Sequence, residues 1–244
     1  MGGHISQPLK AVAFDLDGTL YPNYLLYIRL LPKLALHPFF YSAFSKARNT
    51  LHYPTGNYPP GGYAEEGSFY DKQAEAVAKL LGKPGGQIKQ KLEERVYTSW
   101  EKHFSGIRLF PQLKETLCEL RRSGLRLGIL SDFPPAKKLS LLGLNGFFDT
   151  ALSSEETGAL KPSGIPFAAL ARALDAQPGE ILYVGNNVQY DIEGAKAAGM
   201  ETALIKRNSF STGYVTKHSA GSAGFVFRGY RQLQEYILQY NRRG

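Results

Sequence analysis

The stretch from Ala11 to Leu20 constrains the fold of this 244-residue chain more than any other. Its apolar start, Val12 to Phe14, predicts a short strand that ends at two carboxylates, Asp15 and Asp17, before Gly18 lets the backbone turn. Side chains two residues apart on a strand point to the same side. The carboxyl edge of a parallel sheet is where open α/β folds bind ligands. Two carboxylates there repel each other unless a cation or a phosphoryl-transfer reaction uses them. The stretch therefore predicts an enzyme site.

Strand and helix patterns alternate over most of the chain. Further apolar strands are predicted at Leu125–Ser131, Phe148–Ser153, Ile181–Gly185, Thr202–Ile205 and, more weakly, Phe225–Phe227. Helical periodicity lies between them at Pro111–Arg122, Pro135–Leu142, Ile165–Leu174 and Asp191–Ala198, and Tyr230–Arg243 predicts an amphipathic helix that packs on the sheet. Prolines at helix starts and glycines after helix ends support these limits. The pattern predicts an α/β protein with a doubly wound, Rossmann-like parallel sheet.

One long segment between Leu20 and about Phe110 interrupts the alternation. It shows helical periodicity but no convincing strand, at Tyr24–Lys46, Tyr70–Leu81 and Gln87–Phe104. Residues 52–63 are rich in Tyr, Pro and Gly and predict an irregular loop that either lines the site or only flanks it. The segment leaves the sheet directly after the two carboxylates, where a lid would be tethered. We therefore expect an α/β core at 1–21 and 106–244 and an inserted α-helical cap at 22–105.

Composition narrows the classes of partner. The net charge of +8 suits either anionic ligands or a solvated surface with scattered Lys and Arg. We favour the solvated surface because the densest basic runs are the Arg pairs at 121–122 and 242–243, so no nucleic-acid partner is predicted. The most lipophilic stretch, Tyr24–Phe44, is interrupted by charged residues and prolines, which predicts a covered helix and no membrane partner.

The single cysteine and the N-terminus indicate the compartment. Cys118 has no partner for an intrachain disulfide, which fits a reducing cytosol, and its spacing from Leu117 and Leu120 suggests a buried structural thiol. Residues 1–7 lack the basic and apolar regions of a secretory signal. We therefore expect a cytoplasmic protein, as a monomer or a homodimer.

Polar residues follow the other predicted strands as well. Ser131-Asp132 ends the second strand, Lys161 lies just after the third, and Asn186 and Asp191 follow the fourth. Each signal is weak alone, because a strand-end Ser is usually a cap and a Lys-Pro pair is usually a surface turn. Together they place a hydroxyl, an ammonium, an amide and carboxylates at one edge of one sheet.

In this order the motifs resemble those of the haloacid dehalogenase superfamily of hydrolases. Residues 14–20 look like its first motif, Ser131 its second, Lys161 its third, and Gly185-Asn186 with Asp191 its fourth. The resemblance covers residues 10–20 and about 110–206, and the helical insert has the position of the family's first type of cap.

The resemblance implies a phosphatase mechanism. Asp15 would be the nucleophile that forms an aspartyl phosphate, and Asp17 would protonate the leaving alcohol and then deprotonate water. Ser131 and Lys161 would hold the phosphate oxygens, helped by the backbone at Asp132 and Gly18. Mg²⁺ would be bound by Asp15, the Asp17 backbone carbonyl, Asn186 and Asp191.

Asn186 departs from the family pattern, because phosphatases of the family usually carry Asp there. The amide predicts weaker Mg²⁺ binding or a larger role for Asp191. Dehalogenases of the family need no metal and carry an Asn near this point, but they lack the second Asp of the first motif, and this chain keeps Asp17. A catalytically impaired binding protein is a further alternative.

The expected reaction is therefore hydrolysis of a small phosphorylated metabolite, with a phosphomutase as a less favoured variant because it uses the same core. Residues 17–22 resemble the nucleotidase-like branch of the family. That resemblance favours a nucleoside monophosphate over a sugar phosphate or a phosphoglycolate-like substrate.

Overall fold

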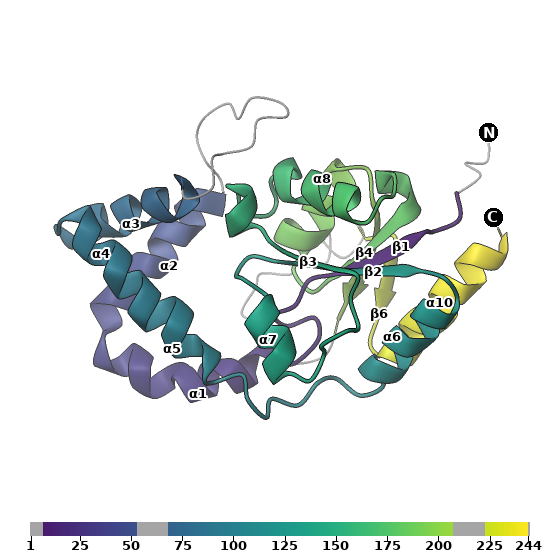
Figure 1. Ribbon diagram of the computed structural model, residues 1–244, viewed down its shortest axis with the longest axis horizontal. Coiled ribbons are helices and arrows are strands. Elements are labelled where there is room, and N and C mark those ends of the chain that lie inside the picture. The colour runs from purple at the N-terminus through teal and green to yellow at the C-terminus, as the bar shows by residue number, and fades with distance from the viewer. Residues whose placement is uncertain (1–6, 53–67, 207–222, 244) are drawn as a thin grey trace.

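The computed structural model describes residues 7–52, 68–206 and 223–243, and these contain a doubly wound α/β core with an inserted helical cap (Figure 1). The core holds a six-stranded parallel sheet with the order β3-β2-β1-β4-β5-β6. The strands are β1 (Ala11–Phe14), β2 (Arg126–Ser131), β3 (Thr150–Ser153), β4 (Ile181–Gly185), β5 (Glu201–Ile205) and β6 (Phe225–Phe227). The predicted fold class is confirmed, and each predicted strand forms within two residues of its expected limits.

The central strand β1 is apolar on both faces because helices cover both sides of the sheet. Val12 and Phe14 belong to the cluster that includes side chains of α6 (Leu113–Arg122) and α10 (Tyr230–Arg243). Ala11 and Ala13 face the opposite cluster, with side chains of α8 (Gly164–Ala173) and α9 (Gly194–Ala197). The short helix α7 (Ala136–Leu141) follows β2. The strand ends are thereby fixed in a rigid three-layer frame.

The cap leaves the core after Tyr21 and consists of helices with a hydrophobic cluster of their own (Figure 1). Its elements are α1 (Asn23–Leu36), α2 (Pro38–His52), α3 (Ser68–Leu81), α4 (Gly85–Leu92), a π-helical turn (Glu93–Tyr97) and α5 (Thr98–Glu101). They lie inside the expected cap limits of 22–105, and those limits themselves stay a prediction. Residues 53–63 of the predicted irregular loop lie outside the described residues.

Two expectations from the sequence are wrong. The stretch Tyr24–Phe44 is not one covered helix: it is divided between α1 and α2, because Pro38 has no N–H to donate and begins the second helix, and large apolar side chains such as Ile28 and Phe39 are exposed. Cys118 is exposed, because it lies on the face of α6 opposite Leu117 and Leu120.

Among the described residues, no helix is both long enough and apolar enough to cross a membrane. The expected cytoplasmic location stays a prediction.

Candidate active site

The candidate site lies where β1, β2 and β4 end side by side. The backbone N–H of Asp15 still belongs to the sheet, donating to the carbonyl of Val184 over 2.9 Å. Parallel pairing of Phe14 with Ile129 places Ser131 of β2 at the same edge. The sheet register therefore brings the Asp15 carboxylate and the Ser131 hydroxyl to one edge, although they are far apart in sequence.

Lys161 is the buried centre of this edge. Its Nζ lies 2.7 Å from Oδ1 of Asp15 and 2.7 Å from Oδ1 of Asp191. It also lies within 3.4 Å of the Leu130 carbonyl and 3.3 Å of the Tyr183 hydroxyl. A buried ammonium is costly unless it is paired, and here two carboxylates pair it.

Asp15 is held on both of its carboxylate oxygens. Oδ1 accepts from Lys161, and Oδ2 accepts from the Thr19 hydroxyl over 2.8 Å. Burial raises the pKa of Asp15 to about 7, while Lys161 opposes the rise and Asp191 and Asp17 add to it. Burial alone would lower the pKa of Lys161, but the carboxylates of Asp15 and Asp191 hold it well above its ordinary value. Asp15 is therefore held in one position beside a buried cation that favours its ionised form, which suits a nucleophile.

Ser131 and Asp132 form the neighbouring part of the edge. The hydroxyl of Ser131 is fully buried and has no hydrogen-bond partner among the described residues. Buried polar atoms normally have a hydrogen-bond partner, so the unpaired Ser131 hydroxyl at this strand end is a candidate ligand-binding group. The Asp132 carboxylate accepts from the backbone N–H of Lys161 over 3.4 Å and therefore ties the second motif to the third.

Asp17 faces other partners than Asp15 does. Its Oδ1 accepts from the Tyr21 hydroxyl over 2.5 Å, and its Oδ2 accepts from Nζ of Lys138 over 2.6 Å. The Asp17 carboxylate is more exposed than that of Asp15, at 26% against 9%. Asp17 is thus the more accessible carboxylate of the pair.

Asn186 closes the opposite wall of the site. The inward atom of its amide lies 3.2 Å from Oδ2 of Asp15, 3.3 Å from the Asp17 carbonyl and 3.1 Å from the Thr19 hydroxyl. With the amide nitrogen inward, Asn186 donates to all three; with the oxygen inward, it completes a cluster of acceptor oxygens that suits a hard cation. Gly18, with φ of +94°, lets the chain pass so close that a Cβ would lie 2.5 Å from the Asn186 amide.

Asp191 is held through both of its carboxylate oxygens, and its expected role as a metal ligand stays a prediction. Its Oδ1 accepts from Lys161, and its Oδ2 accepts from the backbone N–H groups of Asn186 and Asn187 at 3.1 and 3.0 Å. Both oxygens are therefore engaged in fixing the fourth motif. Among the described residues, no three His, Cys, Asp or Glu side chains form a metal-binding group. The oxygen donors that converge are instead a carboxylate, a backbone carbonyl and an amide.

The cap reaches the core through several polar contacts close to these motifs. His52, at the end of α2, donates from Nδ1 to the Lys161 carbonyl over 2.5 Å and stacks on Tyr190 at a centroid distance of 4.1 Å. Arg48 of α2 forms a buried ion pair with Glu155, which also accepts from the Tyr97 hydroxyl over 3.1 Å. Burial raises the pKa of Glu155 to about 7, against the opposing effect of Arg48.

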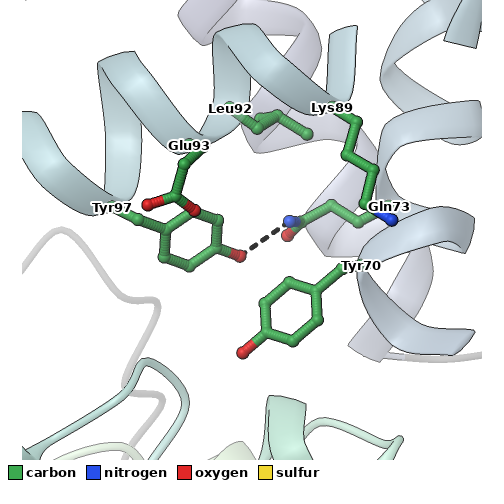
Figure 2. Close-up of a pocket in the computed structure, with 6 residues that line it drawn as sticks. All are labelled: Tyr70, Gln73, Lys89, Leu92, Glu93 and Tyr97. Carbon is green, nitrogen blue, oxygen red and sulfur yellow. Dashed lines mark hydrogen bonds between the residues drawn. The ribbon is translucent and has the colours of Figure 1, made fainter. Parts of the chain in front are cut away.

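A pocket in the cap adjoins this ion pair. Figure 2 shows its lining, with Tyr97 and Gln73 joined by a hydrogen bond of 2.8 Å. The volume is about 250 Å³, and the lining residues are Tyr70, Gln73, Lys89, Leu92, Glu93 and Tyr97. Gln73 also accepts from Arg48 over 2.9 Å, so the pocket and the cap–core contact share a residue.

Sequence reasoning missed several residues of this edge. Thr19 stood inside the first motif without a role. For Lys138 the sequence does contain a signal, because this charged residue has helical spacing with the apolar residues Pro135, Leu139 and Leu142 and shares their buried side. Tyr183 left no signal, since a buried Tyr in a central strand is ordinary.

The fold and the edge define an enzyme of the doubly wound α/β class, with an inserted helical cap and a buried carboxylate directly after β1. The family model described as haloacid dehalogenase-like hydrolase matches residues 9–199, and the chain belongs to this family. The resemblance found in the sequence motifs is thereby confirmed.

Similar proteins of the family are phosphatases by name. A glyceraldehyde 3-phosphate phosphatase from Methanopyrus kandleri is 30% identical, over 83% of this chain and 86% of its own length. A ribulose-1,5-bisphosphate 5-phosphatase from Halopiger xanaduensis is 30% identical, over 80% of this chain and 84% of its own length. The solved structure of a phosphatase of the family from Thermococcus onnurineus covers 94% of this chain and 98% of its own, with a TM-score of 0.61 and 23% identity.

Proposed function

We propose that the protein is a Mg²⁺-dependent phosphomonoester hydrolase that acts through an aspartyl phosphate on Asp15. The proposal rests on one observation, the environment of the Asp15 carboxylate. Its carboxylate is buried, fixed by Lys161 and Thr19, and lies at the edge where the hydroxyl of Ser131 has no partner. A nucleophile held in this way beside an unused donor suits in-line attack on a phosphoryl group.

In the first step, an oxygen of Asp15 attacks phosphorus and the bond to the leaving alcohol breaks. Asp17 gives its proton to the departing oxygen, so the alcohol leaves uncharged. Lys161 and Ser131, with the backbone at Asp132 and Gly18, stabilise the non-bridging oxygens, where negative charge is concentrated. In the second step, Asp17 takes a proton from water, and the water oxygen attacks phosphorus and releases Asp15 and phosphate.

The residues present fit Mg²⁺, which takes oxygen ligands and keeps several waters. Asp15, the Asp17 carbonyl and the Asn186 amide oxygen would hold it, and Asp191 would orient the Asn186 backbone from behind. When bound, Mg²⁺ supplies positive charge that lets an anionic nucleophile approach an anionic phosphate. Asn186 contributes one charge less than a carboxylate, so weaker metal binding follows.

For the substrate, we propose a small phosphorylated carbohydrate. The similar proteins named above act on a triose phosphate and a pentose bisphosphate, and this similarity outweighs the nucleoside monophosphate favoured from residues 17–22. The cap at 22–105 would select the leaving group and exclude water by closing over the site. His52 and Arg48 are polar residues of the cap that contact the core, and the pocket adjoins Arg48 through Gln73.

The side chain of Asn186 favours a second candidate reaction, the hydrolysis of a 2-haloacid. Such a reaction needs no metal, and the amide nitrogen of Asn186 already satisfies the oxygens around it without a cation. The presence of Asp17 is evidence against this reaction. Halide leaves without a proton, so a dehalogenase would not need a second carboxylate as a general acid.

The deciding experiment compares wild type with Asp15→Asn on p-nitrophenyl phosphate with Mg²⁺ or EDTA. We expect turnover only for wild type with Mg²⁺, and mass spectrometry of acid-quenched wild type should locate phosphate on the Asp15 peptide. The matched control is Asp149→Asn, which changes a carboxylate away from this edge. Retained activity of Asp15→Asn overturns the proposal, and halide release from a 2-haloacid in EDTA would favour the second candidate.

A further inference from the structure

A buried ammonium outside the family motifs contacts the acid–base carboxylate. Nζ of Lys138 lies 2.6 Å from Oδ2 of Asp17, across 121 residues of chain, and the lysine is 8% exposed. The other oxygen of Asp17 accepts from the buried hydroxyl of Tyr21. Asp17 therefore has one donor on each oxygen, and one of the donors is a full charge.

The surroundings of Lys138 are suited to an ammonium. Its Nζ lies 5.0 Å from the ring centroid of Phe104 and 5.0 Å from that of Phe133. Phe104 follows the last cap helix, and Phe133 follows Ser131-Asp132 on the core. Aromatic faces attract a cation, and a buried ammonium needs such partners to offset lost hydration. The lysine is thus held by rings as well as by its carboxylate.

We propose that Lys138 is a positioning residue that orients the carboxyl group of Asp17 toward the leaving-group oxygen. This inference rests on the proposed phosphatase function and assigns a role to a residue outside its motifs. A carboxylate has about four lone-pair sites, and Lys138 and Tyr21 occupy two, so the remaining sites are free for proton transfer. Without Lys138 the carboxyl loses one of its two anchors and can rotate away from the reacting oxygen.

The test uses leaving groups that differ in their need for a proton. An alkoxide needs one from Asp17, whereas p-nitrophenolate leaves readily without it. For Lys138→Met we expect kcat/KM to fall about 10²-fold with glycerol phosphate but less than about threefold with p-nitrophenyl phosphate. The ratio kcat/KM is used because it reports the first chemical step, before the water attack that both substrates share.

Two variants control the comparison. Lys138→Arg keeps the charge and should recover part of the lost activity toward glycerol phosphate. Lys137→Met removes the neighbouring, exposed lysine of α7 and should leave the two kcat/KM values in the wild-type ratio. Equal losses of Lys138→Met on both substrates would overturn the proposal, because they would mean that Lys138 serves the phosphate or the fold.

A second measurement does not depend on activity. A double-mutant cycle of Lys138→Met and Asp17→Asn, followed by urea unfolding, reports whether the two side chains interact. We expect the double variant to lose less stability than the sum of the single losses, and strict additivity would overturn the contact. Wild type that hydrolysed neither ester would refute the proposed function, while the cycle would still decide whether Lys138 holds Asp17.

Discussion

The ammonium of Lys161 lies 2.7 Å from Oδ1 of Asp191, and both side chains are almost completely buried. Asp15 contacts the same ammonium at the same distance, so one cation separates two carboxylates at the centre of the site. At this position a lysine has a structural task and a chemical one. It stabilises the buried charges at rest, and in the proposed mechanism it would also bind phosphate oxygens during the reaction.

Replacing Lys161 with Met should therefore damage stability and activity together. Two buried carboxylates lose their shared cation, and breaking a buried pair costs about 3–5 kcal/mol of unfolding free energy. We expect that loss in urea unfolding and a fall of at least about 10²-fold in turnover. Lys10→Met is the control, because its pair with Glu180 is on the surface with Lys10 62% exposed, and only a small change should follow. A Lys161→Met protein as stable as wild type would contradict this account.

Asn186→Asp should strengthen metal binding and weaken the metal-free protein. A carboxylate at 186 would face Oδ2 of Asp15 and the Asp17 carbonyl, which repel it until a cation is present. We expect Mg²⁺ affinity by calorimetry to rise on the order of tenfold, because charge count sets the affinity of such sites. Thermal unfolding in EDTA should shift to lower temperature.

Asn187→Asp is the matched control for that change. It adds the same charge one residue further on, where Oδ1 of Asn187 accepts from the backbone of Gln189 and Tyr190 and an Asp oxygen could do the same. Equal effects of the two substitutions on Mg²⁺ affinity would show that Asn186 is not a ligand.

Much of this arrangement follows from the sequence, because a parallel sheet collects its strand ends at one edge. Apolar runs ending in Asp15, Ser131 and Asn186 were enough to predict the strands and which polar groups share that edge. The separate positions of Asp191 and Asn186 were not predictable, since which oxygen faces Lys161 depends on the turn after β4.

Contacts between the cap and the core could not be predicted from the sequence. The pair of Arg48 and Glu155 spans 107 residues and forms between α2 of the cap and a residue of the core. Lys138 had a signal within its helical pattern, but its contact with Asp17 depends on where α7 lies relative to the turn after β1. The sequence therefore predicts individual elements and strand ends better than docking between elements.

The buried pair of Glu155 and Arg48 should give stability a pH dependence. Burial raises the folded-state pKa of Glu155 to about 7, above its ordinary value of 4.5, so the folded state binds the proton more tightly than the unfolded state. The contribution of Glu155 is then fully present below about pH 4.5 and is lost as the pH rises through 7, by about 3 kcal/mol in total.

Urea unfolding of wild type and Glu155→Gln between pH 4 and 8 measures this dependence. We expect the unfolding free energy of wild type, minus that of Glu155→Gln, to decline as the pH rises across this interval and then to level off. Glu156→Gln, which changes the neighbouring carboxylate, serves as the control. A difference that is constant with pH, or that grows as pH rises, would contradict the raised pKa.

Ser131→Ala should separate activity from stability. The Ser131 hydroxyl is buried without a partner among the described residues, so removing it ends a desolvation penalty and leaves no other group unpaired. We expect the urea midpoint to stay equal to wild type or to rise. Turnover should fall about 10²-fold, since one donor to the phosphate oxygens is lost, and inorganic phosphate should inhibit more weakly.

Ser153→Ala is the control for this prediction. The buried hydroxyl of Ser153 donates to the Asp132 carbonyl over 3.3 Å, and its loss should cost about 1 kcal/mol of unfolding free energy. If Ser131→Ala were instead the less stable variant and kept full activity, the hydroxyl would serve the fold, and the phosphate site would have to be placed elsewhere on the edge.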